Sequence, residues 1–135
     1  MPGVLLRFEP AAGARGNAAY FRFLNRRIPN AGLEQLLVLQ PGRYRMQMRM
    51  RAQSLRSELG LRWQLICAGN GALAGHSEAV EGSFGWRLVD IDILVPAEGC
   101  AAQWLRLVNP VASGSAQRVA GDLWVDDILV TRAST

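Results

Sequence analysis

Strict alternation of polar and apolar side chains over residues 43–52 (RYRMQMRMRA) constrains the fold more than any other feature of the sequence. Successive side chains of a β-strand point to opposite faces of a sheet. One face of this segment therefore receives a tyrosine, methionines and an alanine, and the other receives arginines and a glutamine. The pattern predicts a strand that covers a core on one side and meets water on the other, as antiparallel sheets commonly do.

Four further segments show strand character, and turn residues separate them. The segments 61–67 (LRWQLIC) and 86–96 (WRLVDIDILVP) alternate, and Pro96, which cannot donate a ladder hydrogen bond, ends the second. The other two are 103–110 (QWLRLVNP) and 121–132 (GDLWVDDILVTR). A period of two with turns at short intervals indicates an all-β chain folded as an antiparallel β-sandwich or barrel.

Two segments fall outside this pattern. Residues 51–59 (RAQSLRSEL) place two leucines four residues apart, and we expect a turn or one helical turn there before Gly60. Residues 67–85 (CAGNGALAGHSEAVEGSFG) are rich in small and turn-forming residues, so we expect a long loop. Loops of that length in a compact domain are functional or mobile.

The length and hydropathy of the chain predict one β-sandwich domain over residues 1–135. Half of the 135 residues are hydrophobic, which is enough for a core of ordinary size. No segment approaches the ~20 apolar residues of a membrane span, and the opening MPGVLLRFEP does not resemble a secretory signal. Because strand-like sequence begins almost at residue 1, we expect the chain to be part of a longer protein with further domains.

Arginines line the wet face of residues 43–52, and two interpretations of that face are open. One is a solvated surface whose arginines pair with carboxylates on neighbouring strands, such as Asp90 and Asp92. The other is a cationic surface that binds an acidic polysaccharide or phosphate through its guanidinium groups. The ladder consists of Arg43, Arg45, Arg49 and Arg51, and Arg62 and Arg106 extend it if their strands are neighbours.

The overall charge favours the solvated surface and argues against nucleic acid as a partner. The formal net charge is only +4, and the segment 86–96 contributes two aspartates. Nucleic-acid binders usually gather basic residues on one face and carry a recognisable motif, which is missing from this sequence. The absence of lysine is typical of a GC-rich bacterial genome rather than of selection at one site.

The two cysteines and the single histidine limit the chemistry of the chain. Antiparallel pairing of their strands puts Cys67 and Cys100 at the same end, where they either form a disulfide or remain two buried free thiols. A disulfide implies a periplasmic or extracellular location. These residues do not make a zinc site. His76 lacks a nucleophile motif, a carboxylate pair or a second histidine, so we expect no enzymatic activity.

The four tryptophans divide by the parity of their strands. Trp63 shares its side with two leucines and is predicted to lie in the core. Trp104 shares its side with Arg106 and is predicted to point outward, where an indole ring can stack on the apolar side of a sugar ring. For Trp86 and Trp124 the pattern allows either position.

Taken in order, the segments LEQLLVLQPGRYRMQMRMRAQ, LRWQLIC, GWRLVDIDILVP, CAAQWLRLVNP and GDLWVDDILVTR resemble a galactose-binding-like β-sandwich. In particular the chain looks like a carbohydrate-binding module of the kind appended to xylanases and other glycoside hydrolases. Such modules share a PG-x-Y turn, a strand ending in VP and a final aromatic-x-DD-aliphatic motif. The likeness covers about residues 33–132. It implies a jelly roll that binds a polysaccharide without catalysis.

The resemblance also implies site residues. Many sandwiches of this superfamily hold a structural calcium through a carboxylate of the last strand, which corresponds to Asp126 or Asp127, with Glu9 as the partner near the start. Sugar contacts are expected from outward aromatic and planar polar side chains. The candidate ligand-binding residues are Trp104, Arg106, Arg45, Gln47, Arg49, Arg62 and Gln64.

A narrower similarity supports an alternative function. LLVLQPGRYRM, followed by LRW-x-L-x-C and C-x-x-QWLRL, is similar to the C-terminal module of some bacterial tetratricopeptide-repeat proteins of unassigned function. This resemblance implies a structural or protein-interaction domain with no small ligand. Exposed aromatics beside hydroxyl-binding groups would favour the carbohydrate function, and a contiguous apolar patch would favour the protein partner.

Overall fold

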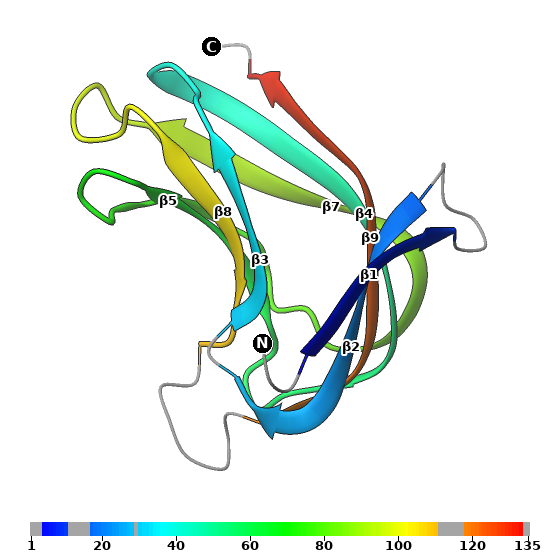
Figure 1. Cartoon of the computed structure of the whole chain (residues 1–135). Helices are drawn as coiled ribbons and strands as arrows, with labels where there is room; N and C mark the ends of the chain where they lie inside the picture. Colours follow the sequence, from blue (N-terminus) through cyan, green and yellow to red (C-terminus); the bar gives the residue numbers. More distant parts are fainter. Residues whose placement is uncertain (1–3, 11–16, 29, 111–117, 134–135) are drawn as a thin grey trace.

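The computed structural model describes residues 4–10, 17–28, 30–110 and 118–133, with the backbone alone described at 7–10, 17 and 30–33. Nine strands in these ranges form two antiparallel sheets packed as a sandwich (Figure 1). The predicted antiparallel β-sandwich is thereby confirmed. The strands are β1 (Val4–Pro10), β2 (Asn17–Arg27), β3 (Asn30–Leu37), β4 (Gly42–Arg56), β5 (Arg62–Cys67), β6 (Leu73–His76), β7 (Gly82–Val95), β8 (Gln103–Val108) and β9 (Arg118–Arg132).

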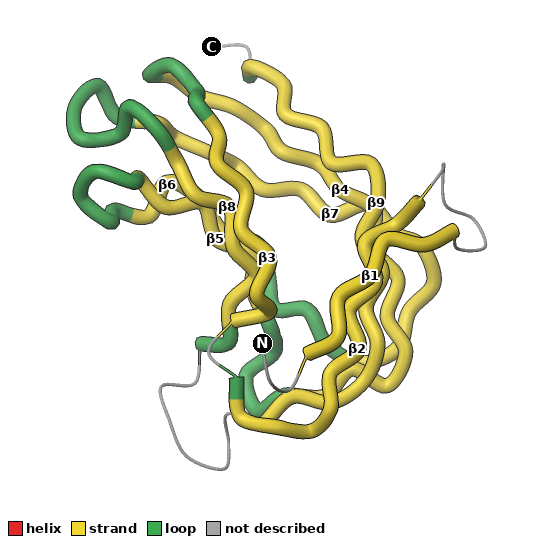
Figure 2. Tube along the Cα trace, in the orientation of Figure 1, coloured by secondary structure: helices red, strands yellow, loops and turns green. Residues whose placement is uncertain are grey.

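The strands divide unequally between the two layers. One sheet has five strands in the order β1-β2-β9-β4-β7, and the other has four in the order β3-β8-β5-β6. Chain connections lie mainly at the two ends of the layers, as the green segments in Figure 2 show. The described residues contain no helix that is long and apolar enough to span a membrane.

The core lies between the layers and is built from the apolar parity of each strand. Met46, Met48 and Met50 of β4 are fully buried, whereas the residues between them reach the surface. Trp63 of β5 meets this row from the other layer, and its Nε1 lies 3.3 Å from the Sδ atom of Met50. The predicted core position of Trp63 and the predicted dry face of residues 43–52 are both confirmed.

Two expectations for irregular segments are wrong. Residues 51–59 do not begin with a helical turn, because β4 continues as a strand to Arg56, which still pairs with Ala120 of β9. Residues 67–85 are not one long loop, because they contain β6 and the first residues of β7. In both places pairing with a neighbouring strand overrides the local preference of the sequence.

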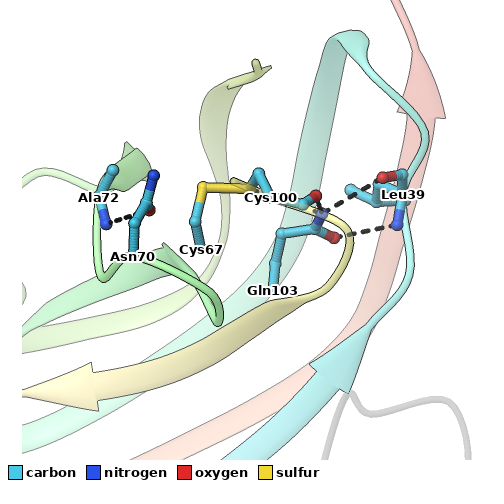
Figure 3. Close-up of a disulfide and its surroundings, with 6 residues drawn as sticks. All are labelled: Leu39, Cys67, Asn70, Ala72, Cys100 and Gln103. Carbon is cyan, nitrogen blue, oxygen red and sulfur yellow. Dashed lines mark hydrogen bonds between the residues drawn. A yellow bond between two sulfur atoms is a disulfide. The ribbon is translucent and has the colours of Figure 1, made fainter. Parts of the chain in front are cut away.

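A disulfide joins Cys67 and Cys100, which were predicted to lie at the same end of two antiparallel strands. Cys67 ends β5, Cys100 precedes β8, and their Cα atoms are 4.7 Å apart (Figure 3). The buried side chain of Gln103 connects the disulfide to the turn between β3 and β4 through hydrogen bonds. Its Oε1 accepts a 2.9 Å hydrogen bond from the backbone N–H of Leu39, and its Nε2 donates to the carbonyls of Leu39 and Cys100 at 3.2 and 2.8 Å. The predicted disulfide is confirmed.

Gly121 allows β9 to lie close against the end of β4. Its φ is +110°, and a Cβ atom there would overlap the carbonyl group of Ser54 and lie 2.7 Å from the Cα atom of Leu55. We therefore expect Gly121→Ala to lower the free energy of unfolding by about 1 to 3 kcal/mol, measured by urea denaturation.

Gly85→Ala is the matched control for this substitution. Gly85 also lies in a long strand of the same sheet, yet a Cβ atom there would have nothing within 4 Å. This control should change stability by no more than about 1 kcal/mol. Equal losses in the two variants would show that the close approach at Gly121 is not what requires glycine.

Candidate functional site

The outer face of the four-stranded sheet presents a row of apolar side chains that crosses all four strands. Burial alternates along β5 and β8, so one parity fills the core and the other faces outward. Register places the outward residues of the four strands side by side, and the two on the edge strands are 50% and 53% exposed. This apolar row consists of Leu36 (β3), Trp104 (β8), Ile66 (β5) and Leu73 (β6).

A polar row lies directly beside it, about 7 Å further along the strands. Arg106 pairs in register with a glutamate of β3 on one side and a glutamine of β5 on the other, and the glutamine pairs with a histidine of β6. All four side chains are planar groups that hydrogen-bond well with hydroxyls. The polar row consists of Glu34, Arg106, Gln64 and His76.

The strands of the four-stranded sheet are curved, so that its outer face is concave. In Figure 1 the strands β3 and β8 curve in the same sense as the long strands of the five-stranded sheet. The outer face of the four-stranded sheet lies on the inside of that curve. Each row crosses four strands, and neighbouring strands are roughly 4.8 Å apart, so a row is about 14 Å long. An extended ligand that lies across the strands follows both rows over this length.

Arg106 is placed between an aromatic ring and a carboxylate. Its Nε lies 3.2 Å from Oε1 of Glu34, with the two side chains 33% and 42% exposed, and its guanidinium carbon is 5.8 Å from the centroid of the Trp104 ring. Although the distance is that of an ion pair, Nε is buried and makes no aligned hydrogen bond. Unsatisfied buried donors are uncommon in folded proteins. Because this Nε atom is buried against Glu34, a ligand on this face can be reached only by the terminal nitrogens of the Arg106 guanidinium.

His76 is held in one orientation by the backbone of the next residue in the chain. Its Nδ1 lies 3.0 Å from the carbonyl oxygen of Ser77, which can only accept, so Nδ1 donates and a neutral ring leaves Nε2 as an acceptor. The Ser77 hydroxyl is buried, accepts from the backbone N–H of Trp63 at 3.0 Å and donates to the carbonyl of Glu78 at 2.8 Å. These bonds fix β6 against β5 and keep His76 in the polar row.

The predicted ligand-binding residues do not form one site, because they lie on two opposite faces of the sandwich. Trp104, Arg106, Arg62 and Gln64 belong to the outer face of the four-stranded sheet. The remaining three belong to β4 in the other sheet, so the expected sideways extension of the β4 ladder by Arg62 and Arg106 is wrong. The residues on the other face are Arg45, Gln47 and Arg49.

Carboxylates of neighbouring strands lie beside two of the four arginines of the β4 ladder. Arg45 Nε lies 3.7 Å from Oδ1 of Asp92, and Gln47 donates a 2.9 Å hydrogen bond to Asp90. Arg49 lies 3.4 Å from the carboxylate of Asp127. Exposed pairs of this kind contribute little stability. They nevertheless favour the interpretation of this face as a solvated surface over that of a polyanion-binding surface.

The tryptophans of the five-stranded sheet are already stacked by their neighbours. The Trp124 ring packs against Tyr20 with centroids 5.0 Å apart and an interplanar angle of 19°, and the Arg51 guanidinium lies 4.7 Å from its centroid. Because β2, β9 and β4 are adjacent, the three groups stand side by side across the sheet. The Arg49 guanidinium likewise lies 5.1 Å from the Trp86 ring. The Trp124 ring is thus contacted by both an aromatic ring and a guanidinium, whereas the Trp86 and Trp104 rings, which are half-buried like Trp124, each have an arginine guanidinium nearby, at 5.1 and 5.8 Å.

The proposed calcium ligands do not assemble among the described side chains. Asp126 is buried on β9, and the carboxylate of its neighbour Asp127 faces Arg49. The side chain of Glu9 lies outside the described residues. Where side chains are described, no group of three histidines, cysteines, aspartates or glutamates could hold a metal ion. Backbone carbonyls and water also supply calcium ligands, so the structural calcium stays a prediction.

Five residues of the two rows were not found by sequence reasoning. Leu36 and Ile66 look like ordinary strand residues, and Glu34 precedes the first segment that alternates clearly. Leu73 and His76 lie in the segment expected to be a loop. The pairing of β8 with β3 and β5 is what brings these residues to Trp104, and that pairing has no signal in a single sequence.

The sandwich is similar to solved carbohydrate-binding modules. A CBM4 module matches 97% of this chain over 79% of its own length with a TM-score of 0.64 and 13% identity. A xylan-binding domain of CBM22 matches 98% of this chain over 83% of its own length with a TM-score of 0.56 and 12% identity. The fold of this chain is therefore a β-sandwich that resembles those of solved carbohydrate-binding modules.

Proteins of other function share the same fold. A cyclase from Fischerella sp. TAU, solved with 4-(1H-indol-3-yl)butan-2-one, matches 100% of this chain over 72% of its own length, with a TM-score of 0.60 and 18% identity. No protein-family model matches the sequence, and neither does any curated protein. At these identities the likeness defines the architecture, and the function has to be argued from the residues themselves.

Proposed function

We propose that this protein is a non-catalytic module that binds a polysaccharide across the outer face of its four-stranded sheet. The observation that supports this most is the apolar row around Trp104 beside the polar row of Glu34, Arg106, Gln64 and His76. An aromatic ring stacks on the apolar side of a pyranose, and planar polar groups alongside take its hydroxyls. Such binding needs no nucleophile and no general base.

The charge of this face suits a neutral polysaccharide. The charges of Arg106 and Glu34 cancel at the centre of the face, and Arg62 lies one row further along β5. Affinity that comes from stacking and neutral hydrogen bonds changes little with ionic strength, whereas affinity for a polyanion falls as salt rises. We therefore expect retention of the protein by a neutral polysaccharide to resist salt.

Affinity electrophoresis through gels that contain xylan, β-glucan, galactan or polygalacturonate tests the proposal at low and high salt. Trp104→Ala should weaken binding to the recognised polymer at least tenfold, because it removes the central stacking group. Trp86→Ala, which removes a half-buried tryptophan from the opposite face, should leave the affinity unchanged. Arg45→Ala/Arg49→Ala should also have no effect.

Two outcomes count against the proposal. If Trp86→Ala or the arginine double variant weakens binding as much as Trp104→Ala does, the ligand lies on the other sheet or the variants are damaged. Circular dichroism of each variant separates these two cases. If no polymer retards the protein at either salt concentration, the module does not bind the polysaccharides of the panel and the second function below is favoured.

The second candidate is a protein-interaction domain, and the same apolar row favours it. Leu36 and Leu73 are half exposed on either side of Trp104 and Ile66. Exposed apolar groups that adjoin one another often mark protein contacts. In that case Leu36→Ser/Leu73→Ser would abolish association with a partner protein, and the polysaccharide panel would show no retardation.

The disulfide supports a location outside the reducing cytoplasm, in the periplasm or outside the cell. Protein taken from its native host should then contain no free thiol. Mass spectrometry after alkylation under denaturing conditions, with and without prior reduction, measures this directly. Alkylation of Cys67 and Cys100 without reduction would contradict the proposed location.

A further inference from the structure

Unbalanced positive charge gathers at one end of the five-stranded sheet. Arg27 at the end of β2 pairs in register with Arg118 at the start of β9, and Arg26 precedes Arg27. A β-bulge separates Leu24 from Arg26, and Asn25 within it has a φ of +59°. The three arginines border one open hollow of about 550 Å³, which we call the arginine hollow, together with Leu24 and Asn25.

The arginine hollow differs from the β4 ladder in having no counter-charge among the described residues. Arg26, Arg27 and Arg118 make no ion pair there, whereas Arg45 and Arg49 of the ladder each face an aspartate. The guanidinium of Arg118 donates a 2.8 Å hydrogen bond to the backbone carbonyl of Asn25, which holds it at the bulge. Like charges directly opposite on neighbouring strands destabilise a sheet. The pairing of Arg27 with Arg118 thus carries an electrostatic cost at this end of the sheet.

We propose that the arginine hollow binds a tetrahedral oxyanion, either free sulfate or phosphate or a sulfate ester borne on a polysaccharide. Guanidinium groups form paired hydrogen bonds with such oxygens, and an anion between Arg27 and Arg118 turns their repulsion into attraction. β-bulges recur beside binding sites because they redirect side chains. The site belongs to the five-stranded sheet, so it is independent of the proposed sugar-binding face.

Thermal unfolding and isothermal titration test this site with defined probes. Sodium sulfate, sodium phosphate and a heparin-derived tetrasaccharide are compared with sodium chloride at equal ionic strength. The variant is Arg26→Gln/Arg27→Gln, and the matched control is Arg43→Gln/Arg45→Gln, which removes the same two charges from the β4 ladder. A sulfate, phosphate or heparin complex should be at least tenfold weaker in the variant and unchanged in the control.

The probes also identify the source of the anion. Binding of inorganic sulfate or phosphate would define a free-anion site, and binding of the tetrasaccharide alone would define a site for a polymer-borne sulfate. In the absence of any anion, the variant should unfold at a temperature no lower than the wild-type protein, because Arg27 and Arg118 no longer repel each other. Equal weakening in variant and control would overturn the proposal, since it would show attraction to net charge alone. The proposal would also be overturned if sulfate, phosphate and the tetrasaccharide changed the unfolding temperature no more than chloride does and gave no binding heat in the titrations.

Discussion

Trp63→Ala should lower the free energy of unfolding by about 3 to 5 kcal/mol, which is the usual cost of deleting a large buried aromatic side chain. The Trp63 ring has no exposed surface and bridges the two layers through its contact with Met50. Alanine leaves a cavity at the centre of the sandwich, which the rigid strands on either side can fill only in part. Urea denaturation followed by far-ultraviolet circular dichroism measures the loss.

Trp63→Phe is the control that separates packing from the hydrogen bond. Phenylalanine keeps most of the apolar volume but has no N–H to donate to the Met50 sulfur, so it should cost clearly less than alanine. The backbone N–H of Trp63 still bonds to Ser77 in both variants. A Phe variant as unstable as the Ala variant would contradict the dominance of packing at this position.

Removal of the disulfide by Cys67→Ala/Cys100→Ala should cost about 3 to 4 kcal/mol in the chain-entropy account of cross-links. The cysteines are 33 residues apart in sequence, so the bond restricts a long segment of the unfolded chain. Both residues are buried, and alanine avoids leaving two thiols or hydroxyls without partners. Urea denaturation of the wild-type protein with and without reductant provides the independent comparison.

The Gln103 network gives this prediction a structural control. Because Gln103 bonds to Leu39 and to the backbone of Cys100, Gln103→Leu should loosen the turn between β3 and β4 while the disulfide stays intact. Reductant should lower the free energy of unfolding of the Gln103→Leu variant by the same amount as it lowers that of the wild-type protein. A wild-type protein that loses no stability on complete reduction would contradict the entropic contribution of the cross-link.

The strands β4, β5, β7 and β8 are readable from sequence because each has one dry and one wet face. The parity of residues 43–52 places the methionines in the core and the arginines outside, and the parity of β8 places Trp104 outward. The alignment of Cys67 with Cys100 follows from the same antiparallel pattern. In each case the signal is local, since a period of two needs only the neighbouring residues.

The predictions for residues 51–59 and 67–85 were wrong because the structure of these segments depends on strands that are distant in sequence. Leu55 and Leu59 suggest a helical turn, yet Leu55 is buried and Leu59 exposed because β4 keeps its pairing with β9 to Arg56. That pairing depends on Gly121, which is distant in sequence. Similarly, β6 is strand only because β5 provides it with a hydrogen-bonding partner, and His76 reaches the polar row for that reason.

The sequence by itself determined which side of β4, β5 and β8 is wet, and therefore the class of fold and the outward position of Trp104. Tertiary structure alone decided which strands share a sheet. Arg45 and Arg106 have the same local pattern, but their strands belong to different layers, so one is balanced by Asp92 and the other lies between Trp104 and Glu34. Side-chain parity is a property of neighbouring residues, whereas sheet membership is set by contacts between residues far apart in the chain, where packing of the whole core makes the choice.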